Sequence, residues 1–415
     1  MAGIAALAFA YVFSQFYRSF LAVLTPDLTA ALGVNKGDLS LAAGVWFLTF
    51  AAMQFPVGIG LDRFGPRRTA GVIFGLAGTG GAFLFALANG PMALVVAMGL
   101  LGIGCAPVLM SGIFLFARRF DPMRFAVLSS WLIAFGNLGN VIGTEPLAAA
   151  AEAYGWRGVM AGLGISNLIV AVAVLRFVED PPVESSAGAG LRGYLTLLKT
   201  PALWTIFPMV LLCYAPVAGI RGLWAGPWLQ DLFGADALQI GRTTLWMALA
   251  MVAGSILYGP LDRWLGTRKW IVIGGNAVVV SVIATFALNP LIGLGTATLL
   301  LVTLGVAGTS YAVLLAHGRA FVAADLVGRG VTLLNFFSIA GVGLMQFATG
   351  RLVAAQTDPS SVESYRLLFA SYAVALLFAM TVRSCRAARS AADHARDRRD
   401  EVTLGMGDGV RPHLH

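Results

Sequence analysis

The chain has 415 residues, of which 58% are hydrophobic and 12% are charged, and its formal net charge is +8. An ordinary soluble domain is about 45–50% apolar and about 25% charged, so these values exclude a soluble enzyme, a nucleic-acid-binding protein and a disulfide-stapled secreted module. A helix that crosses a bilayer needs about 20 mostly apolar residues, and twelve such helices need about 240. The composition therefore predicts an all-α polytopic membrane protein with short loops.

The apolar residues form twelve runs, in two groups of six. We expect the first six spans at about 4–28, 39–61, 69–88, 92–117, 125–150 and 157–178, and the last six at about 202–229, 239–261, 270–288, 291–316, 330–352 and 365–385. The break between the groups contains Asp180-Pro181-Pro182 and has linker composition. The predicted organisation is a six-helix bundle at 1–178, a cytoplasmic linker at 179–201, a second bundle at 202–385 and a disordered charged cytoplasmic tail at 386–415.

The charges of the loops alternate along the chain. Arg63, Arg67 and Arg68 follow the second span, whereas the connections at 89–91 and 289–290 carry no charge. Because basic loops stay on the cytoplasmic side, this pattern places both termini in the cytoplasm. We expect a multi-pass protein of the bacterial inner membrane, in contact with the lipid bilayer and monomeric.

The residues that usually hold metals or perform catalysis are scattered. Cys105, Cys213 and Cys385 each stand alone in or at the edge of an apolar segment, without CxxC spacing. Three of the four histidines lie in the tail, which leaves only His317 near the membrane. We therefore expect no metal, no cofactor and no enzymatic activity.

A motif at the end of the second span recurs about 200 residues later. The segment at 58–68 reads GIGLDRFGPRR, and the segment at 259–269, which closes the eighth span, reads GPLDRWLGTRK. A repeat of this length, six spans long, indicates a duplicated bundle. The candidate gating residues in the two copies are Gly58, Asp62, Arg63, Gly65, Arg67, Arg68, Asp262, Arg263 and Arg268.

The first copy of the motif resembles the GxxxDRxGxRR signature of the major facilitator superfamily. The resemblance implies two pseudo-symmetric six-helix bundles that rock about a midplane site and expose it alternately to either side. It also implies that the basic loop end ties neighbouring helix ends together in one of the two states, with Asp62 as the partner that makes and breaks the tie. Plain positive-inside anchoring is the alternative explanation for Arg67 and Arg68.

Two arginines lie deep within predicted spans. Arg18 is in the first span and Arg221 is in the seventh, the equivalent span of the other half. A charge at mid-helix costs roughly 2.5–3.5 kcal/mol, so their presence suggests a function, namely a clamp for a carboxylate or phosphate. Internal pairing with a structural carboxylate is the alternative. The candidate substrate-binding residues are Arg18, Arg221, Tyr11, Gln15, Tyr214, Trp224, Asn137, Asn140, Asn335 and Tyr311.

Arginines at these two positions look like those of the organophosphate:phosphate antiporters and related organic-anion porters of the superfamily. The run at 221–229, RGLWAGPWL, is similar to their pattern of Arg, then Trp, then Pro. However, the second span holds no basic residue and the fifth holds no histidine. The departure favours a small organic anion, such as a carboxylate, over a dianionic phosphate ester.

Glu145 is the candidate for coupling to protons. It is expected inside the outer third of the fifth span, just before Pro146. Burial there would raise the pKa of a carboxyl and suit it to carry a proton. Pairing with an arginine, or capping the helix at Pro146, is an equally open explanation.

The leading hypothesis is secondary active transport of a small organic anion by alternating access, by proton symport or anion exchange. A nitrate/nitrite porter is one alternative, because the run at 135–140, FGNLGN, looks like that family's fifth span. Members of that family, however, carry their substrate arginines on spans two and eight; in this chain span two has no arginine and span eight has only Arg242, at its outer end. A drug:proton antiporter is another, but the run at 139–146 departs from the GxxxGPxxGG motif. A non-transporting sensor is a weaker candidate, because the tail is too short for a folded output domain.

Overall fold

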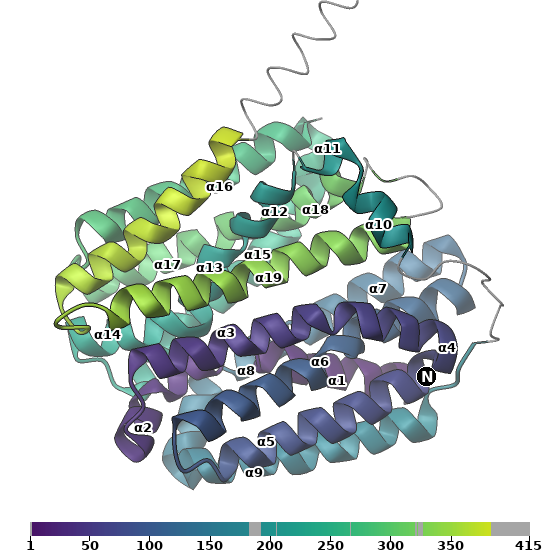
Figure 1. Cartoon of the computed structure of the whole chain (residues 1–415), viewed down its shortest axis with the longest axis horizontal. Helices are drawn as coiled ribbons and strands as arrows, with labels where there is room; N and C mark the ends of the chain where they lie inside the picture. Colours follow the sequence, from purple (N-terminus) through teal and green to yellow (C-terminus); the bar gives the residue numbers. More distant parts are fainter. Residues whose placement is uncertain are drawn as a thin grey trace, which may run out of the picture.

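A computed structural model describes residues 2–181, 192–204, 206–265, 267–319, 322 and 327–382. Throughout this part of the chain the regular elements are helices, with no strand. The predicted tail at 386–415 and the centre of the predicted linker, residues 182–191, lie outside the described residues. We refer to residues 2–181 as the N-half and to the described residues from 192 to 382 as the C-half; Figure 1 shows them in its lower and upper parts.

The helices follow one another with short connections. Those of the N-half are α1 (Ala2–Phe16), α2 (Leu21–Leu32), α3 (Lys36–Ala52), α4 (Gln54–Ile73), the π-helix η1 (Phe74–Gly78), α5 (Thr79–Ala86), α6 (Pro91–Arg119), α7 (Pro122–Gly136), α8 (Leu138–Ile142) and α9 (Glu145–Phe177). Those of the C-half are α10 (Arg192–Leu198), α11 (Pro201–Trp204), α12 (Phe207–Cys213), α13 (Ala215–Gly219), the π-helix η2 (Ile220–Trp224), α14 (Ala225–Phe233), α15 (Ala237–Leu265), α16 (Arg268–Leu288), α17 (Leu294–Gly308), α18 (Tyr311–Arg319), α19 (Val327–Ala354) and a last helix, Val362–Val382.

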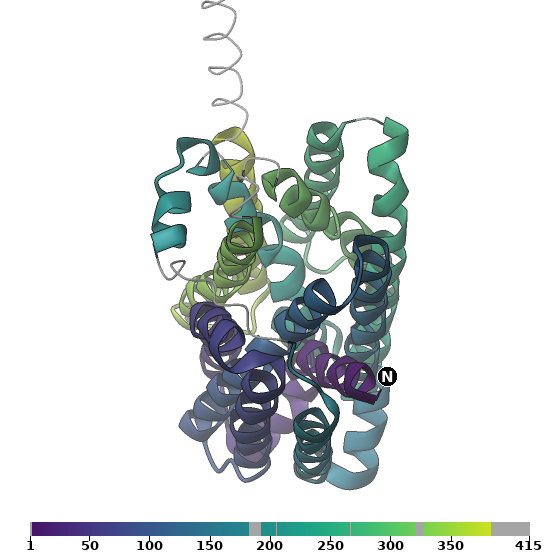
Figure 2. The same cartoon turned by 90° about the vertical axis from the view of Figure 1, so that its right-hand side faces the viewer.

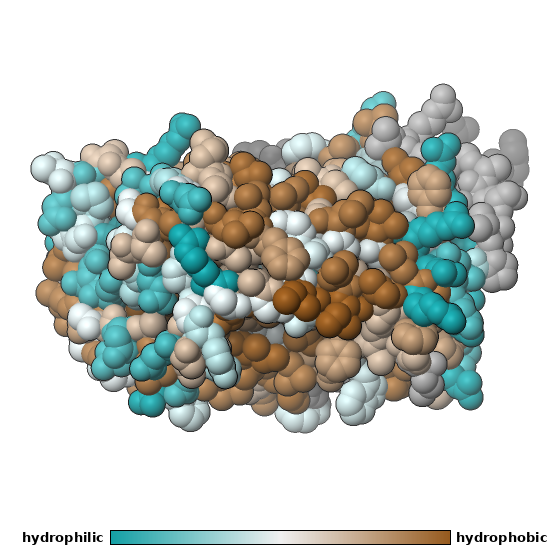
Figure 3. Space-filling view, turned by 90° about the horizontal axis from the view of Figure 1, so that it is seen from below, coloured by the Kyte–Doolittle hydropathy of each residue, from teal (hydrophilic) through white to brown (hydrophobic). Residues whose placement is uncertain are grey.

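Ten helices in the described residues are long and apolar enough to cross a membrane, or eleven when the bent pair α1 and α2 counts as one span. The longest stretch, Lys36–Ala86, has 51 residues; as one straight helix it would be about 76 Å long, more than twice the hydrocarbon thickness of a bilayer, but it consists of two helices joined at a kink. Its backbone leaves the helical conformation at Gly65, with φ 76° and ψ 171°. The surface in Figure 3 carries an apolar belt between two hydrophilic ends, as expected of a membrane protein.

The helices in the region predicted for the fifth and sixth spans, 125–150 and 157–178, are interrupted at two places. The first break is at Gly143 and Thr144, between the candidate span Met123–Ile142 and α9, because Pro146 has no N–H to donate and is tolerated only in the first turn of a helix. The second is at Gly155, where the backbone of α9 leaves the helical conformation with φ 72° and ψ 148°. The second break lies between the two predicted spans, in agreement with the expected boundary, whereas the first is an additional break inside the predicted fifth span.

The two halves end and restart helices in the same way about 200 residues apart. Gly33 ends α2 and Gly234 ends α14, both in the left-handed conformation that glycine adopts without strain, with φ 62° and 65°. Two residues later, the Asn35 side chain accepts a hydrogen bond from the backbone N–H of Asp38, and the Asp236 side chain accepts one from the backbone N–H of residue 239. These matched caps place the same turn in each half.

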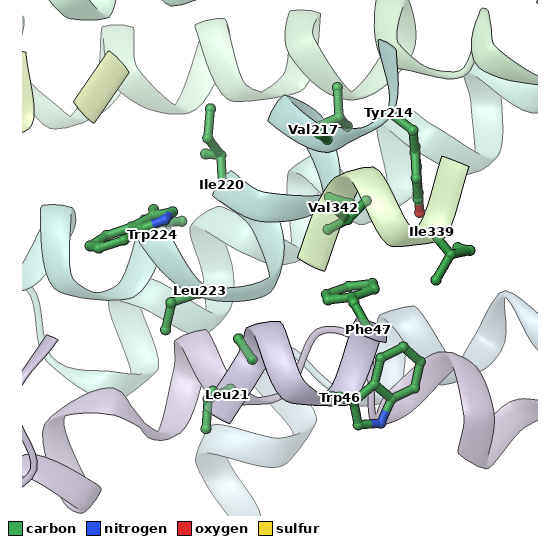
Figure 4. Close-up of a cluster of buried hydrophobic side chains, with 14 of the residues drawn as sticks. Leu21, Trp46, Phe47, Tyr214, Val217, Ile220, Leu223, Trp224, Ile339 and Val342 are labelled. Atoms are coloured by element: carbon green, nitrogen blue, oxygen red, sulfur yellow. The ribbon is translucent and has the colours of Figure 1, made fainter. Parts of the chain in front are cut away.

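The main contacts between the halves are those of α3 with α19, of α9 with α15, and of α2 with α14, η2 and α15. Glycine permits close approach at these crossings. A Cβ on Gly44 would lie 3.2 Å from the Phe347 ring, and one on Gly226 would lie 2.1 Å from the backbone oxygen of Ala22. In Figure 4, Phe47 of α3 projects toward Val342 of α19 across this interface.

We call the two ends of the molecule the Lys36 end and the linker end. The Lys36 end, on the left of Figure 1, holds the turns at 33–35 and 234–236; the linker end, on the right, holds α10 and the start of α1. At the linker end, the Tyr194 ring of α10 contacts Phe55 of the N-half, and Phe55 in turn contacts Phe336 of α19. Figure 2, which views the molecule from the linker end, shows α10 beside the C-half.

Candidate functional site

Breaks in three helices position the central polar residues. The chain bends by 57° between α1 and α2, and Arg18 lies in the intervening turn. Arg221 lies in η2, the π-helix between α13 and α14. Tyr311 begins α18 after a break at 309–310. Irregular backbone at membrane depth is tolerated where it is buried in protein or lines a cavity, and π-helical segments frequently occur at functional sites.

Arg221 is anchored across the boundary between the halves. Its side chain is 2% exposed, and its Nη1 donates to Oδ1 of Asn140 over 2.8 Å. Asn140 in turn donates to Asn137, which also accepts a hydrogen bond from Nε2 of Gln15. The chain of amides therefore joins α1, the break between α7 and α8, and η2. Four of the predicted site residues, Arg221 included, thus form one network.

Arg18 has a different environment. Its guanidinium carbon lies 4.7 Å from the centre of the Phe50 ring and 5.6 Å from that of Trp46, so it stacks on the aromatic face of α3. Its Nε is buried without a hydrogen-bond partner in the structure, and so is Nε of Arg221. Among the described residues, no carboxylate forms an ion pair with either arginine. The two guanidiniums thus keep donors available for an anion.

Three tyrosines surround the arginines. The rings of Tyr214 and Tyr311 have centroids 4.3 Å apart, and both hydroxyls interact electrostatically with Arg221. Tyr11 interacts with Arg18 and Tyr214. It fits because position 136 is glycine, where a Cβ would lie 2.0 Å from its ring. The cluster therefore combines two cations with hydroxyl and amide groups, which is suited to bind an anion that also carries polar substituents.

Two predicted members lie apart from the cluster. Trp224 is fully buried, and its indole N–H donates to the hydroxyl of Thr349 on α19 over 3.1 Å; Figure 4 shows it far from Tyr214. It therefore joins helices of the C-half. Asn335 is half-buried on α19, and within the described residues no hydrogen bond is shown between it and Arg18 or Arg221. Sequence reasoning did not select Trp46; aromatic residues on a neighbouring span give no periodic signal that an arginine will stack on them.

The gating motif has its own partner at the linker end. The backbone N–H of Arg67 donates to Oδ1 of Asp180 over 2.8 Å, and its side chain donates to the backbone oxygen of Leu175 at the end of α9. Position 65 requires glycine for two reasons. Its φ is 76°, and a Cβ there would lie 2.4 Å from the Asp180 carboxylate. The observed tie thus runs from Arg67 to Asp180, a residue assigned in the sequence only to the linker.

The other motif residues are more loosely placed. Asp62, Arg63 and Arg68 are exposed, and Asp62 interacts electrostatically with Tyr194 of α10. A Cβ on Gly58 would lie 3.6 Å from the Tyr194 hydroxyl. The side chains of the second copy, those of Asp262, Arg263 and Arg268, lie outside the described residues. No ion pair in the described residues involves Asp62.

Glu145 lies at a helix break within the predicted fifth span. It is the first residue of α9, directly after the break at Gly143 and Thr144 and before the kink at Gly155, at the Lys36 end. Its carboxylate pairs with Arg242 of α15 over 2.7 Å, and the two side chains are 32% and 61% exposed. The structure therefore shows the pairing with an arginine that the sequence left open. In the described part of the chain, no group of three or more His, Cys, Asp or Glu residues is placed to hold a metal ion.

Curated relatives are similar over part of the chain. The probable L-galactonate transporter of Escherichia coli is 23% identical over 62% of this chain, and the probable sulfoacetate transporter of Cupriavidus necator is 24% identical over 61%. The matches span 60% and 62% of those two relatives, less than two thirds of their length. The sialic acid transporter of Escherichia coli is 23% identical over 72% of this chain and 75% of its own.

Solved structures share the fold over nearly the whole chain. A bacterial homolog of the human lysosomal transporter Spinster has a TM-score of 0.74 at 17% identity and covers 92% of this chain and 95% of its own. The nucleoside transporter NupG, as a D323A mutant, has a TM-score of 0.72 at 15% identity, covering 92% and 100%. The model of the Major Facilitator Superfamily matches residues 7–346. Because the family model matches most of the chain and the described helices are long and apolar enough to cross a membrane, the chain is a multi-pass membrane protein that belongs to the Major Facilitator Superfamily.

Proposed function

We propose that this protein is a secondary active transporter of a small organic anion, with a carboxylate as the group that it recognises. The observation that carries the proposal is the pair of arginines, one from each half, without a carboxylate partner in the described residues. Placing such charges in a membrane is costly unless they meet an opposite charge. A transported anion supplies that charge, and each guanidinium can donate two parallel hydrogen bonds to it.

The neighbouring groups support a hydroxylated or otherwise polar anion. Tyr11, Tyr214, Gln15 and the two asparagines offer neutral hydrogen-bonding groups around the arginines. Three relatives are named for galactonate, sulfoacetate and sialic acid, all of them organic acids. A cationic drug would meet like charge at both arginines.

The proposed architecture is twelve spans, as bundles at 1–178 and 202–385 joined by a cytoplasmic linker, with both termini in the cytoplasm of a bacterium and the bundles in its inner membrane. Transport would proceed by alternating access, driven by proton symport or by exchange with a second anion. The exposed Glu145–Arg242 pair supports a structural role for Glu145. A protonatable residue that carries charge through the membrane would be expected to lie closer to the arginines.

Uptake into proteoliposomes tests the proposal. Purified protein would be reconstituted with L-galactonate, sulfoacetate or sialic acid inside, and entry of the same labelled compound measured by counterflow, with nitrate and a cationic dye as comparison solutes. The proposal predicts entry of at least one organic anion and its loss in Arg221→Gln. Entry of the cation alone would refute it.

A sensor is the second candidate, because a membrane sensor protein of Escherichia coli is 25% identical over 60% of this chain. A sensor would bind an anion without counterflow. Thermal-shift binding on the same samples therefore separates the two functions, since a bound anion stabilises the folded protein by mass action.

A further inference from the structure

We propose that Lys36 and Asp231 form the gate that holds the two halves together at the Lys36 end, and that this ion pair must break each time that end opens. Lys36 is the first residue of α3 in the N-half, and Asp231 lies near the end of α14 in the C-half. The proposal rests on the proposed alternation between two open states, but not on the nature of the transported solute.

Within the part of the chain that the structure describes, the hydrogen bonds of the Lys36 ammonium all go to the other half. It pairs with the Asp231 carboxylate, and it donates to the backbone oxygen of Pro359 over 2.7 Å and to the hydroxyl of Ser360 over 2.8 Å. An ammonium has three N–H donors, so its hydrogen-bonding capacity is met by the C-half alone. The Lys36 and Asp231 side chains are 14% and 18% exposed, so the contact is largely shielded from water.

A third side chain supports the carboxylate. The Tyr365 hydroxyl of the last helix donates to the same Oδ2 of Asp231 that pairs with Lys36, and the Lys36 ammonium lies 5.3 Å from the centre of the Tyr365 ring. Tyr365 is itself fully buried. The carboxylate is therefore held in place by its own half and receives the lysine as a fixed acceptor.

The surrounding backbone is already in contact. Gly222 and Gly226 lie against the backbone oxygens of Arg18 and Ala22, where a Cβ would be 2.8 Å and 2.1 Å away. Helices this close cannot separate without breaking the lysine contact beside them. Because the same close packing involves the turn that carries Arg18, opening of the Lys36 end is coupled to the position of the central arginines.

Another ion pair between the halves provides a contrast. Arg242 and Glu145 form one contact over 2.7 Å, with 61% and 32% of their side chains exposed. An exposed pair of this kind contributes little, since water solvates both charges when they separate. Lys36, by contrast, loses three partners at once when the halves separate. The shielded pair is therefore the gate.

Distances between spin labels test the gate without any substrate. Labels would be attached at Ala30→Cys on α2 and Gln239→Cys on α15, both exposed and in different halves, after replacement of the three native cysteines by alanine. We expect wild-type side chains at the gate to give mainly a short distance. Asp231→Asn should raise the ratio of long to short distances about tenfold, because a shielded ammonium is left without its counter-charge.

Matched variants make the result specific. Glu363→Gln removes an exposed ion pair with Arg366 inside the last helix, and should leave the distances unchanged. Glu145→Gln should change the ratio by less than about fivefold. Tyr365→Phe keeps both gate charges and should give a smaller shift in the same direction as Asp231→Asn, provided that it elutes as a folded single species.

Wild-type distances in folded Asp231→Asn or Tyr365→Phe protein would overturn the gate. An equal effect of Glu145→Gln would also overturn it, because the shielded pair would then have no special part. Since no solute is present, failure of the gate is distinguishable from failure of the organic-anion assignment, which the counterflow assay tests.

Discussion

Converting Asn140 to aspartate would place a carboxylate against the guanidinium that we assign to the substrate. Asn140→Asp preserves the size of the side chain and the 2.8 Å contact with Nη1 of Arg221. The side chain is only 9% exposed, so the new charge is shielded from water and acts mainly on its neighbour. The variant therefore neutralises one arm of the proposed clamp while leaving its shape intact.

The size of the effect follows from the geometry. An anion bound to the opposite edge of the guanidinium would lie about 6 Å from the new carboxylate, and at an effective dielectric constant of about 20 the repulsion is about 3 kcal/mol. We therefore expect about a hundredfold loss of affinity. Asn140→Leu is the matched control: it removes one hydrogen bond without adding a charge, and should change affinity by no more than about tenfold.

Thermal shift against L-galactonate, sulfoacetate and sialic acid, followed by titration of whichever compound stabilises the wild type, measures this effect. The ranking expected is wild type, then Asn140→Leu, then Asn140→Asp. Equal affinity in Asn140→Asp and the wild type would show that Arg221 does not contact the anion. A cation that binds only Asn140→Asp would support the charge argument independently.

Three further substitutions test the packing. Gly65→Ala should lower the free energy of unfolding by about 1–2 kcal/mol from its left-handed backbone alone, and by more through the clash with Asp180, as a lower melting temperature in detergent would show. Trp224→Phe should lower the free energy of unfolding by about 1 kcal/mol, because the hydrogen bond to Thr349 is lost, and should leave the affinity for the anion unchanged. A large loss of affinity would show that Trp224 contacts the anion. Gly226→Val should separate the halves at the Lys36 end, and an unchanged short distance between the spin labels described above would contradict this.

Composition and periodicity were sufficient to predict the helices, because a membrane requires long apolar runs and leaves few alternatives. The repeat was visible because the motif at 58–68 recurs at 259–269. The matched helix ends at Gly33 and Gly234 became apparent only in the structure. The break at Gly143–Thr144 lies inside the predicted fifth span, and the apolar residues on both sides gave no sign of it. Only Pro146, the second residue of α9, marked the point where the helix restarts.

The central site was predictable to the extent that charge is conspicuous in an apolar segment. Arg18 and Arg221 were conspicuous because placing a charge inside a membrane span costs free energy. The residues beside them were predicted because helical spacing puts them on the same face. Trp224 was predicted to flank the face that carries Arg221, but the π-helix shifts the residues that follow Arg221 by a fraction of a turn. Such a bulge leaves no reliable trace in the sequence.

The contacts between distant segments could not be predicted. Lys36 and Asp231 are 195 residues apart, and each lies at a helix end where a charge is unremarkable. Asp180 looked like part of a polar linker until the structure placed it against Arg67. In each case, the partner is determined by tertiary packing.

Equilibrium binding to the two arginine variants tests the central claim most directly. Wild type, Arg18→Gln and Arg221→Gln would be titrated with the organic acid that gives the largest thermal shift, and the Lys36→Met gate variant would serve as a control outside the arginine cluster. The account predicts that the acid binds the wild type and the gate variant, and that each arginine variant loses at least about a hundredfold in affinity, since a charge-assisted bidentate contact is removed. Unchanged affinity in both arginine variants would contradict it.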